Sequence, residues 1–136
     1  MDNLRFYLEQ TRGKTATDKC FDDIKNIIYI SLKSVQNAVG NDKHCFEMYG
    51  YDVLIEDNLK PWLIEVNASP SVSTTTESDK VLKMNLMRDV FKIVVPPEWA
   101  EEGNTKHGAN TCKDYKVGSF SLIIDESQTD LIEKAK

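Results

Sequence analysis

Three polar side chains near the middle of the chain have types and spacing suited to holding a metal ion. Asp52 lies in a run of aromatic and β-branched residues, and Glu65 and Asn67 lie two residues apart in a second such run. Both runs predict β-strands, and the polar stretch between them predicts a short connection. We therefore expect a β-hairpin that carries two carboxylates and one amide.

The length of the connection determines which side chains face each other. If residues 57–60 form a four-residue loop, Glu56 pairs with Pro61 and Asp52 pairs with Glu65. Asn67, two residues after Glu65, lies on the same face, because side chains alternate along a strand. The opposite face then receives apolar and aromatic side chains: Tyr51, Val53, Ile55, Trp62, Ile64 and Val66.

Like charges directly opposite each other destabilise a sheet, so folding alone gives no reason for this arrangement. A divalent cation would remove the repulsion, and three oxygen donors suit Mg²⁺, which usually keeps waters and binds substrate phosphates. The alternative interpretation is that Asp52 and Glu65 lie on a solvated sheet face, paired with lysines. Spacing by itself leaves both interpretations open.

Two amphipathic helices are expected to cover the hairpin. Apolar residues at spacings of three and four predict one helix over residues 17–39, with Thr17 as its N-cap. A second helix is predicted over residues 79–95, capped at Thr76 or Ser78 and ended by consecutive prolines. Its wide apolar face predicts burial against a sheet.

The two ends of the chain show weaker patterns. Residues 2–14 form an element of undetermined type that breaks at Gly13, where glycine permits a turn. Residues 98–116 are polar and predict a mobile surface loop, residues 120–124 predict a last short strand, and residues 125–136 form a polar tail.

Composition limits the partners that the chain can have. The 136 residues suffice for one domain, and 17 basic against 22 acidic residues give a net charge of −5, the wrong sign for binding nucleic acid or anionic membranes unaided. No stretch approaches the ~20 apolar residues of a membrane span or forms a signal segment, so a cytoplasmic protein is expected. The three cysteines show no Cys-x-x-Cys spacing, which disfavours a thiolate zinc site.

The sequence around the predicted hairpin, CFEMYGYDVLIEDNLKPWLIEVNASPS, together with RFYLEQTRGK and NDKHCFE, resembles the tubulin tyrosine ligase-like family of ATP-grasp ligases. Its polyglutamylase branch is the most similar, and the resemblance runs from Leu4 to Pro96. It implies an α+β fold in which residues 1–97 form the C-terminal part of an ATP-grasp domain, with a small antiparallel sheet, its metal-binding hairpin and two main covering helices. Residues 98–136 would add a polar loop, a short strand and a tail.

The resemblance also implies the chemistry of the site. In this family an aspartate on one strand and an E-x-N on the next bind the magnesium that bridges the phosphates of ATP, and this pattern falls on Asp52, Glu65 and Asn67. The implied activity is an ATP-dependent carboxylate–amine ligase that attaches glutamate to glutamate side chains of tubulin C-terminal tails. Such an enzyme would act on the cytoskeleton, including cilia and basal bodies, with or without auxiliary subunits.

The resemblance leaves parts of the enzyme unaccounted for. The lysines that reach the phosphates and the segment that brackets adenine lie upstream of this region in the family, so this chain alone is expected to be insufficient for activity. A body of net charge −5 would also repel acidic tubulin tails, which places the tubulin-facing surface elsewhere. The alternative is a truncated, non-catalytic paralogue that acts as a binding module.

Overall fold

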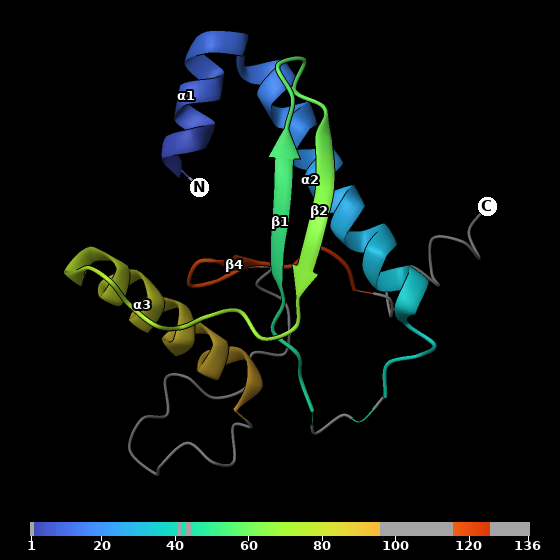
Figure 1. Ribbon diagram of the computed structural model, residues 1–136, viewed down its shortest axis with the longest axis vertical. Coiled ribbons are helices and arrows are strands. Elements are labelled where there is room, and N and C mark those ends of the chain that lie inside the picture. The colour runs from blue at the N-terminus through green and yellow to red at the C-terminus, as the bar shows by residue number, and fades with distance from the viewer. Residues whose placement is uncertain (1, 41, 43–44, 96–115, 126–136) are drawn as a thin grey trace. The chain divides into compact units, whose positions relative to one another are not determined.

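The computed structural model describes residues 2–40, 42, 45–95 and 116–125 (Figure 1). They form three helices and two small antiparallel hairpins, which confirms the α+β class. In chain order the elements are α1 (Asp2–Arg12), α2 (Lys14–Val35), β1 (Gly50–Ile55), β2 (Pro61–Asn67), α3 (Glu77–Val94), β3 (Lys116–Val117) and β4 (Phe120–Ser121). Residues 1–70 and 71–136 form two compact units, which are described separately.

The first unit begins with two helices joined by a glycine turn. The predicted break at Gly13 is confirmed: this residue has a positive φ of 82°, and its N–H donates to the carbonyl of Glu9 at 3.1 Å. The predicted helix over residues 17–39 is wrong at both ends, because α2 runs from Lys14 to Val35, so Thr17 is not its N-cap. The Thr17 hydroxyl instead donates to the carbonyl of Gly13 at 2.9 Å, from a fully buried position inside the helix.

The interface between α1 and α2 is small. Leu8 and Cys20 are buried there, and burial raises the pKa of the Cys20 thiol. Arg5 connects the two helices: it pairs with Asp18, and its guanidinium lies 4.9 Å from the centre of the Phe21 ring. The ion pair and the cation–π contact of Arg5 add to the burial of Leu8 and Cys20 in joining α1 to α2.

In the second unit, α3 matches its predicted boundaries closely. Thr76 caps it by accepting a hydrogen bond from the N–H of Asp79 at 3.2 Å, and the helix ends just before the proline pair at 96–97. Much of its predicted apolar face is exposed among the described residues, Leu82 at 64% and Phe91 at 53%. That this helix covers the first hairpin stays a prediction, because the two elements belong to different units.

The second hairpin is held on α3 by one carboxylate. Asp89 is buried and accepts hydrogen bonds from the N–H and the hydroxyl of Ser119, at 2.9 and 3.1 Å, and pairs with Lys92 at 2.9 Å. These contacts, the backbone hydrogen bond first, lower the pKa of Asp89. Gly118 beside it has a φ of 58° and no room for a side chain.

Two predictions for the end of the chain need correction. The strand predicted over residues 120–124 covers only Phe120–Ser121, and it pairs with Lys116–Val117, of which Lys116 had been assigned to a loop. A two-residue turn joins the two strands, and each strand contributes two residues to the ladder. The rest of the predicted loop and tail, residues 98–115 and 126–136, lies outside the described residues, and the division of the chain at residue 97 stays a prediction.

Within the described part of the chain, no helix has both the length and the apolar character needed to cross a bilayer.

Candidate metal-binding hairpin

The register of the first hairpin brings the two predicted carboxylates together. Asp52 pairs with Glu65, as the sequence predicts, and Gly50 pairs with Asn67. Nearer the tip the pairing shifts by one residue, so Ile55 pairs with Pro61. The predicted pair Glu56–Pro61 is therefore wrong, and a β-bulge in β2 separates the two halves of the ladder.

The hairpin loop explains the shift. The loop comprises residues 56–60 and not 57–60, because β1 ends at Ile55 and β2 begins at Pro61, and the N–H of Glu56 donates to the carbonyl of Lys60 at 3.0 Å across its ends. Leu59 has a positive φ of 66°, and its N–H donates to the carbonyl of Glu56 at 2.9 Å. The loop is one residue longer than predicted, and β2 holds one extra residue, Ile64, in the bulge. The two shifts cancel, so Asp52 still pairs with Glu65.

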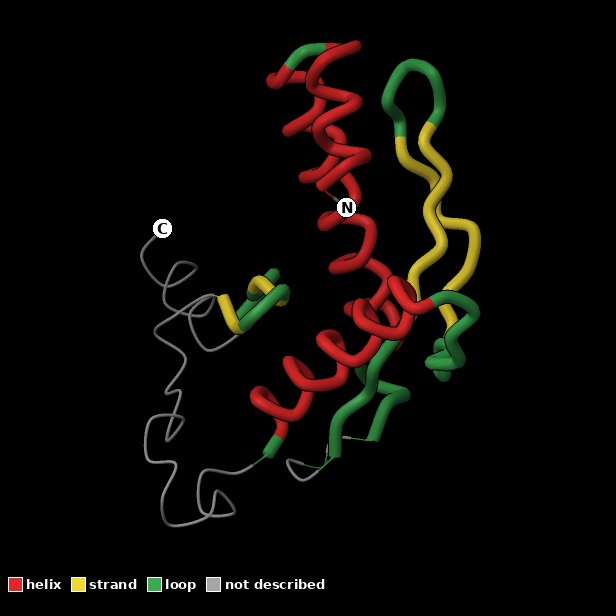
Figure 2. The backbone as a smooth tube through the Cα atoms, turned by 90° about the vertical axis from the view of Figure 1, so that its left-hand side faces the viewer, coloured by secondary structure: helices red, strands yellow, loops and turns green. Residues whose placement is uncertain are grey.

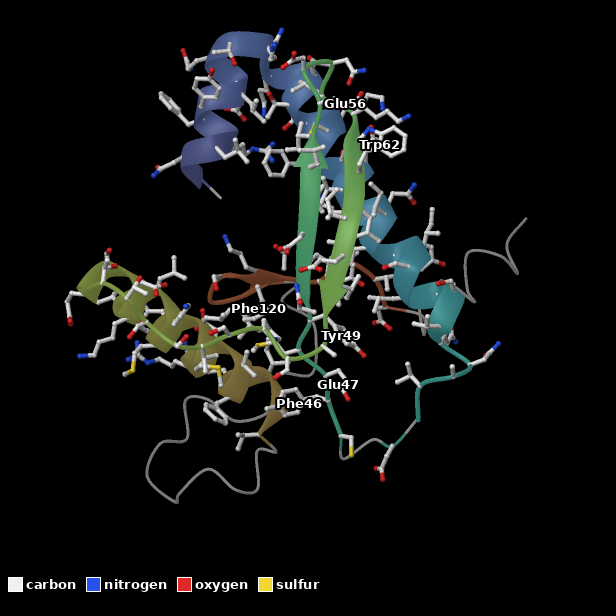
Figure 3. All side chains as sticks on the ribbon, viewed as in Figure 1. Phe46, Glu47, Tyr49, Glu56, Trp62 and Phe120 are labelled. Atoms are coloured by element: carbon white, nitrogen blue, oxygen red, sulfur yellow. The ribbon has the colours of Figure 1, made fainter. Side chains whose placement is uncertain are left out.

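The bulge changes which apolar side chains share a face with the carboxylates. Trp62 pairs with Leu54, and because side chains alternate along β1, both lie on the face of Asp52. The prediction that Trp62 lies on the opposite face is wrong for this reason. Leu54 is 56% exposed and Trp62 is 45% exposed, with the ammonium of Lys60 at 3.8 Å from the centre of the indole ring. Figure 3 labels Trp62 near the tip of the hairpin, beside Glu56.

Helix α2 covers the other face of the hairpin. The hydroxyl groups of Ser31 and Tyr51 lie 2.8 Å apart, which joins the helix to β1. Figure 1 shows α2 running behind the two strands, and Figure 2 shows both helices of this unit on one side of them. Within the described part of the first unit, the face that carries Asp52 and Glu65 is the one that α2 leaves uncovered, and we call it the uncovered face.

The donor atoms on the uncovered face are of the types that a hard divalent cation prefers. Asp52, Glu65 and Asn67 are all exposed, and the side-chain N–H of Asn67 donates to Glu65 Oε1 at 3.1 Å. This bond occupies the amide nitrogen and leaves the amide oxygen of Asn67 available as a ligand. Two carboxylates and one amide oxygen would leave several positions of an octahedral ion to water or phosphate oxygens, as is usual for magnesium.

The alternative interpretation, in which lysines pair with the two acids, finds no support in the described part of the chain. There, neither Asp52 nor Glu65 forms an ion pair, so no described side chain neutralises the charge of the pair. The same residues contain no group of three or more His, Cys, Asp or Glu side chains suited to a metal. The candidate site therefore consists of two carboxylates with Asn67 as its third donor.

The comparison with known sequences identifies the family. A sequence model of the tubulin-tyrosine ligase family matches residues 1–102, which is well over half of the chain. The chain belongs to the tubulin-tyrosine ligase family. No solved structure gives a significant match.

Several members of this family are similar over nearly the whole chain. It is 53% identical over 134 residues to the "Probable alpha-tubulin polyglutamylase Ttll1" of Tetrahymena thermophila, covering 98% of this chain and 32% of that protein. It is 41% identical over 123 residues to the mouse "Probable tubulin polyglutamylase TTLL9", covering 90% of this chain and 24% of that protein. The Tetrahymena "Tubulin glycylase 3B" is 36% identical over 90% of this chain and 10% of its own length. The chain thus spans 24% to 32% of the length of these two polyglutamylase relatives.

Sequence reasoning missed two features that shape this site. It did not identify the contact between Ser31 and Tyr51, for which the only signal is a serine within the apolar stripe of α2 and a tyrosine in the facing strand. It also missed the bulge at Ile64, which no glycine or proline marks. Both features act on the orientation of the hairpin and not on the identity of the donor side chains.

Proposed function

We infer that this chain is the magnesium-binding C-terminal part of an ATP-grasp enzyme that ligates glutamate to tubulin tails. The observation that carries the proposal is the pairing of Asp52 with Glu65 across the hairpin, with Asn67 bonded to Glu65 on the uncovered face. Membership of the tubulin-tyrosine ligase family supports a ligase, and the higher identity to a polyglutamylase than to a glycylase, 53% against 36%, supports glutamate over glycine as the added residue.

The proposed reaction is the ATP-dependent formation of an amide. A glutamate side chain of the tubulin tail takes the γ-phosphoryl group of ATP and becomes an acyl phosphate, and the amine of free glutamate displaces the phosphate. In this scheme Asp52, Glu65 and Asn67 would hold Mg²⁺, which when bound neutralises the phosphates of ATP and holds them in line. The chain's own contribution is to orient three oxygen donors on a rigid pair of strands, since α2 supports the opposite face.

Electrostatics supports a division of labour with the rest of a longer enzyme. The chain has a net charge of −5, and the tubulin tails are acidic, so this segment would repel the acceptor. We assign the basic tubulin-facing surface, the adenine contacts and the phosphate-binding lysines to other parts of the enzyme. The same proposal places the enzyme on the cytoskeleton, including cilia and basal bodies. It also includes a need for auxiliary subunits.

The proposal is tested by replacing the matched segment of the Tetrahymena relative with this chain and measuring incorporation of labelled glutamate into tubulin. Glu65→Gln should abolish incorporation, because it removes one anionic donor while keeping the size and hydrogen-bonding capacity of the side chain. Glu56→Gln is the matched control, since Glu56 lies in the loop and outside the three donors. Unchanged incorporation by the Glu65→Gln variant would overturn the metal assignment, whereas incorporation of glycine in place of glutamate would contradict only the substrate.

A non-catalytic binding module is the second candidate, and the coverage of only 32% of the Tetrahymena relative favours it for this chain in isolation. It predicts that the 136-residue chain by itself cosediments with microtubules but does not ligate glutamate. Absence of cosedimentation, or glutamate incorporation by the chain alone, would exclude this candidate.

A further inference from the structure

Gly50 occupies a position in the hairpin where glycine is unexpected. It is the first residue of β1 and lies directly opposite Asn67, the last residue of β2. Glycine weakens a strand because it has no side chain to pack and loses more backbone freedom on folding than other residues. Gly50 does not have the positive φ that Gly13 and Gly118 have, so its backbone conformation does not require glycine. The reason for glycine must lie in the space around it.

That space is occupied by Pro70. A Cβ atom added to Gly50 would lie 3.1 Å from the Cβ of Pro70 and 3.7 Å from the Cβ of Asn67. The first distance is shorter than ordinary carbon–carbon contact, and the second is ordinary contact. Pro70 cannot yield by a side-chain rotation, because its ring is fixed to the backbone. Glycine therefore permits residues 68–70 to fold back against the start of β1.

This fold-back begins at the proposed third ligand. Asn67 is the residue at which the chain leaves β2, and its side-chain N–H donates to Glu65 Oε1 at 3.1 Å. With its nitrogen engaged, its amide oxygen is the side-chain atom that remains available to a cation. We propose that Gly50 is a positioning residue: the space it leaves for Pro70 fixes the exit of the chain from β2 and thereby the orientation of Asn67. The inference deepens the proposed function and rests on it for the identity of the bound ion.

Substitution of Gly50 by alanine in the full 136-residue chain tests this role, with Mn²⁺ as a paramagnetic probe for the magnesium site. Bound Mn²⁺ should broaden the side-chain amide resonances of Asn67, and Gly50→Ala should raise the Mn²⁺ concentration needed for half-broadening about threefold or more. Gly40→Ala is the matched control, because an added Cβ at Gly40 meets no atom within 4 Å. Equal half-broadening concentrations for the two variants would overturn the inference.

A rescue experiment separates positioning from a general loss of structure. In the Gly50→Ala background, Pro70→Gly removes the Cβ that the new methyl group meets, whereas Pro70→Ala removes the ring but keeps that Cβ. Pro70→Gly also loosens the backbone more than Pro70→Ala does, so each double variant is compared with its own Pro70 single variant. Of the two double variants, only Gly50→Ala with Pro70→Gly should need the same Mn²⁺ concentration for half-broadening as its Pro70 single variant, Pro70→Gly. Equal rescue by both changes, or by neither, would contradict the steric account.

The failure of this inference and the failure of the proposed function give different results. If Mn²⁺ causes no localised broadening in the unmodified chain at ~10 mM, the metal site itself is contradicted. The positioning role is then decided in metal-free protein by the side-chain amide resonances of Asn67. Gly50→Ala should shift them and Gly40→Ala should leave them in place, and identical resonances in both variants would overturn the role of Gly50.

Discussion

Removal of one carboxylate from the hairpin should change stability in opposite directions with and without magnesium. Asp52 and Glu65 are directly paired and exposed, and no ion pair within the described chain compensates them. Opposed side chains on antiparallel strands contribute about 0.2 to 1 kcal/mol, so relief of this repulsion by Glu65→Gln should stabilise the metal-free chain by about 0.5 kcal/mol. For a chain of this size that corresponds to a rise in melting temperature of about 2 °C.

Magnesium should reverse the order. A cation that binds only the folded chain stabilises it by RT ln(1 + [L]/Kd), which is about 1.4 kcal/mol at a tenfold excess over Kd. The unmodified chain should gain this stabilisation, and the Glu65→Gln variant should gain much less because it has lost an anionic ligand. The order of the two melting temperatures should therefore reverse as the magnesium concentration rises.

The assay is thermal unfolding monitored by circular dichroism, in EDTA and at increasing MgCl₂, with NaCl adjusted to constant ionic strength. Glu56→Gln is the control, since it removes the same charge from the loop and should show no crossover. The reasoning is refuted if Glu65→Gln lowers the melting temperature in EDTA, or if magnesium raises the melting temperatures of the unmodified chain and both variants equally.

Three further predictions concern the second unit. Gly118→Ala should release β3 and β4 from α3, because the added Cβ would overlap the carboxylate of Asp89. Hydrogen exchange over residues 116–121 should then accelerate at least tenfold. The pKa of Asp89 is lowered in the folded state, so its stabilising contribution is present above its ordinary pKa of 3.8 and is lost as the pH falls through the folded value. The amide of Ser119 should lose protection in that acidic range, and Asp89→Asn should remove this pH dependence. Thr76→Ala should destabilise α3 by about 1 kcal/mol through loss of its cap, measurable as earlier fraying of the first turn by hydrogen exchange, whereas Thr74→Ala should have no such effect.

The pairing of Asp52 with Glu65 could be predicted from sequence although the detailed register could not. The prediction relied on a loop of residues 57–60 and an uninterrupted ladder, and both assumptions are wrong. The longer loop and the bulge at Ile64 each shift the register by one residue, in compensating directions. Neither has a sequence signal: Leu59 adopts a positive φ without being glycine or asparagine, and the bulge contains no glycine.

Helix boundaries were predictable where local chemistry allows one outcome. At α3 the hydroxyl of Thr76 accepts from the N–H three residues ahead, and Thr76 was one of the two predicted caps. The proline pair at 96–97 forbids continuation of the helix, so its end was predicted to within one residue and its start to within two. Thr17 was ambiguous, because a threonine hydroxyl can either cap a helix or bond back to the carbonyl four residues earlier. Packing of α1 against α2 buries Thr17 and selects the second outcome.

The central claim, that Asp52, Glu65 and Asn67 are ligands of one divalent cation, is tested most directly by anomalous diffraction. Crystals of the chimeric enzyme grown with MnCl₂ and ADP should show an anomalous peak on the uncovered face of the hairpin, about 2.0 to 2.3 Å from oxygen atoms of all three side chains. The peak should vanish in the Glu65→Gln variant. A manganese ion bound to ADP but held by other side chains, with Asp52 and Glu65 in contact with solvent only, would contradict the claim.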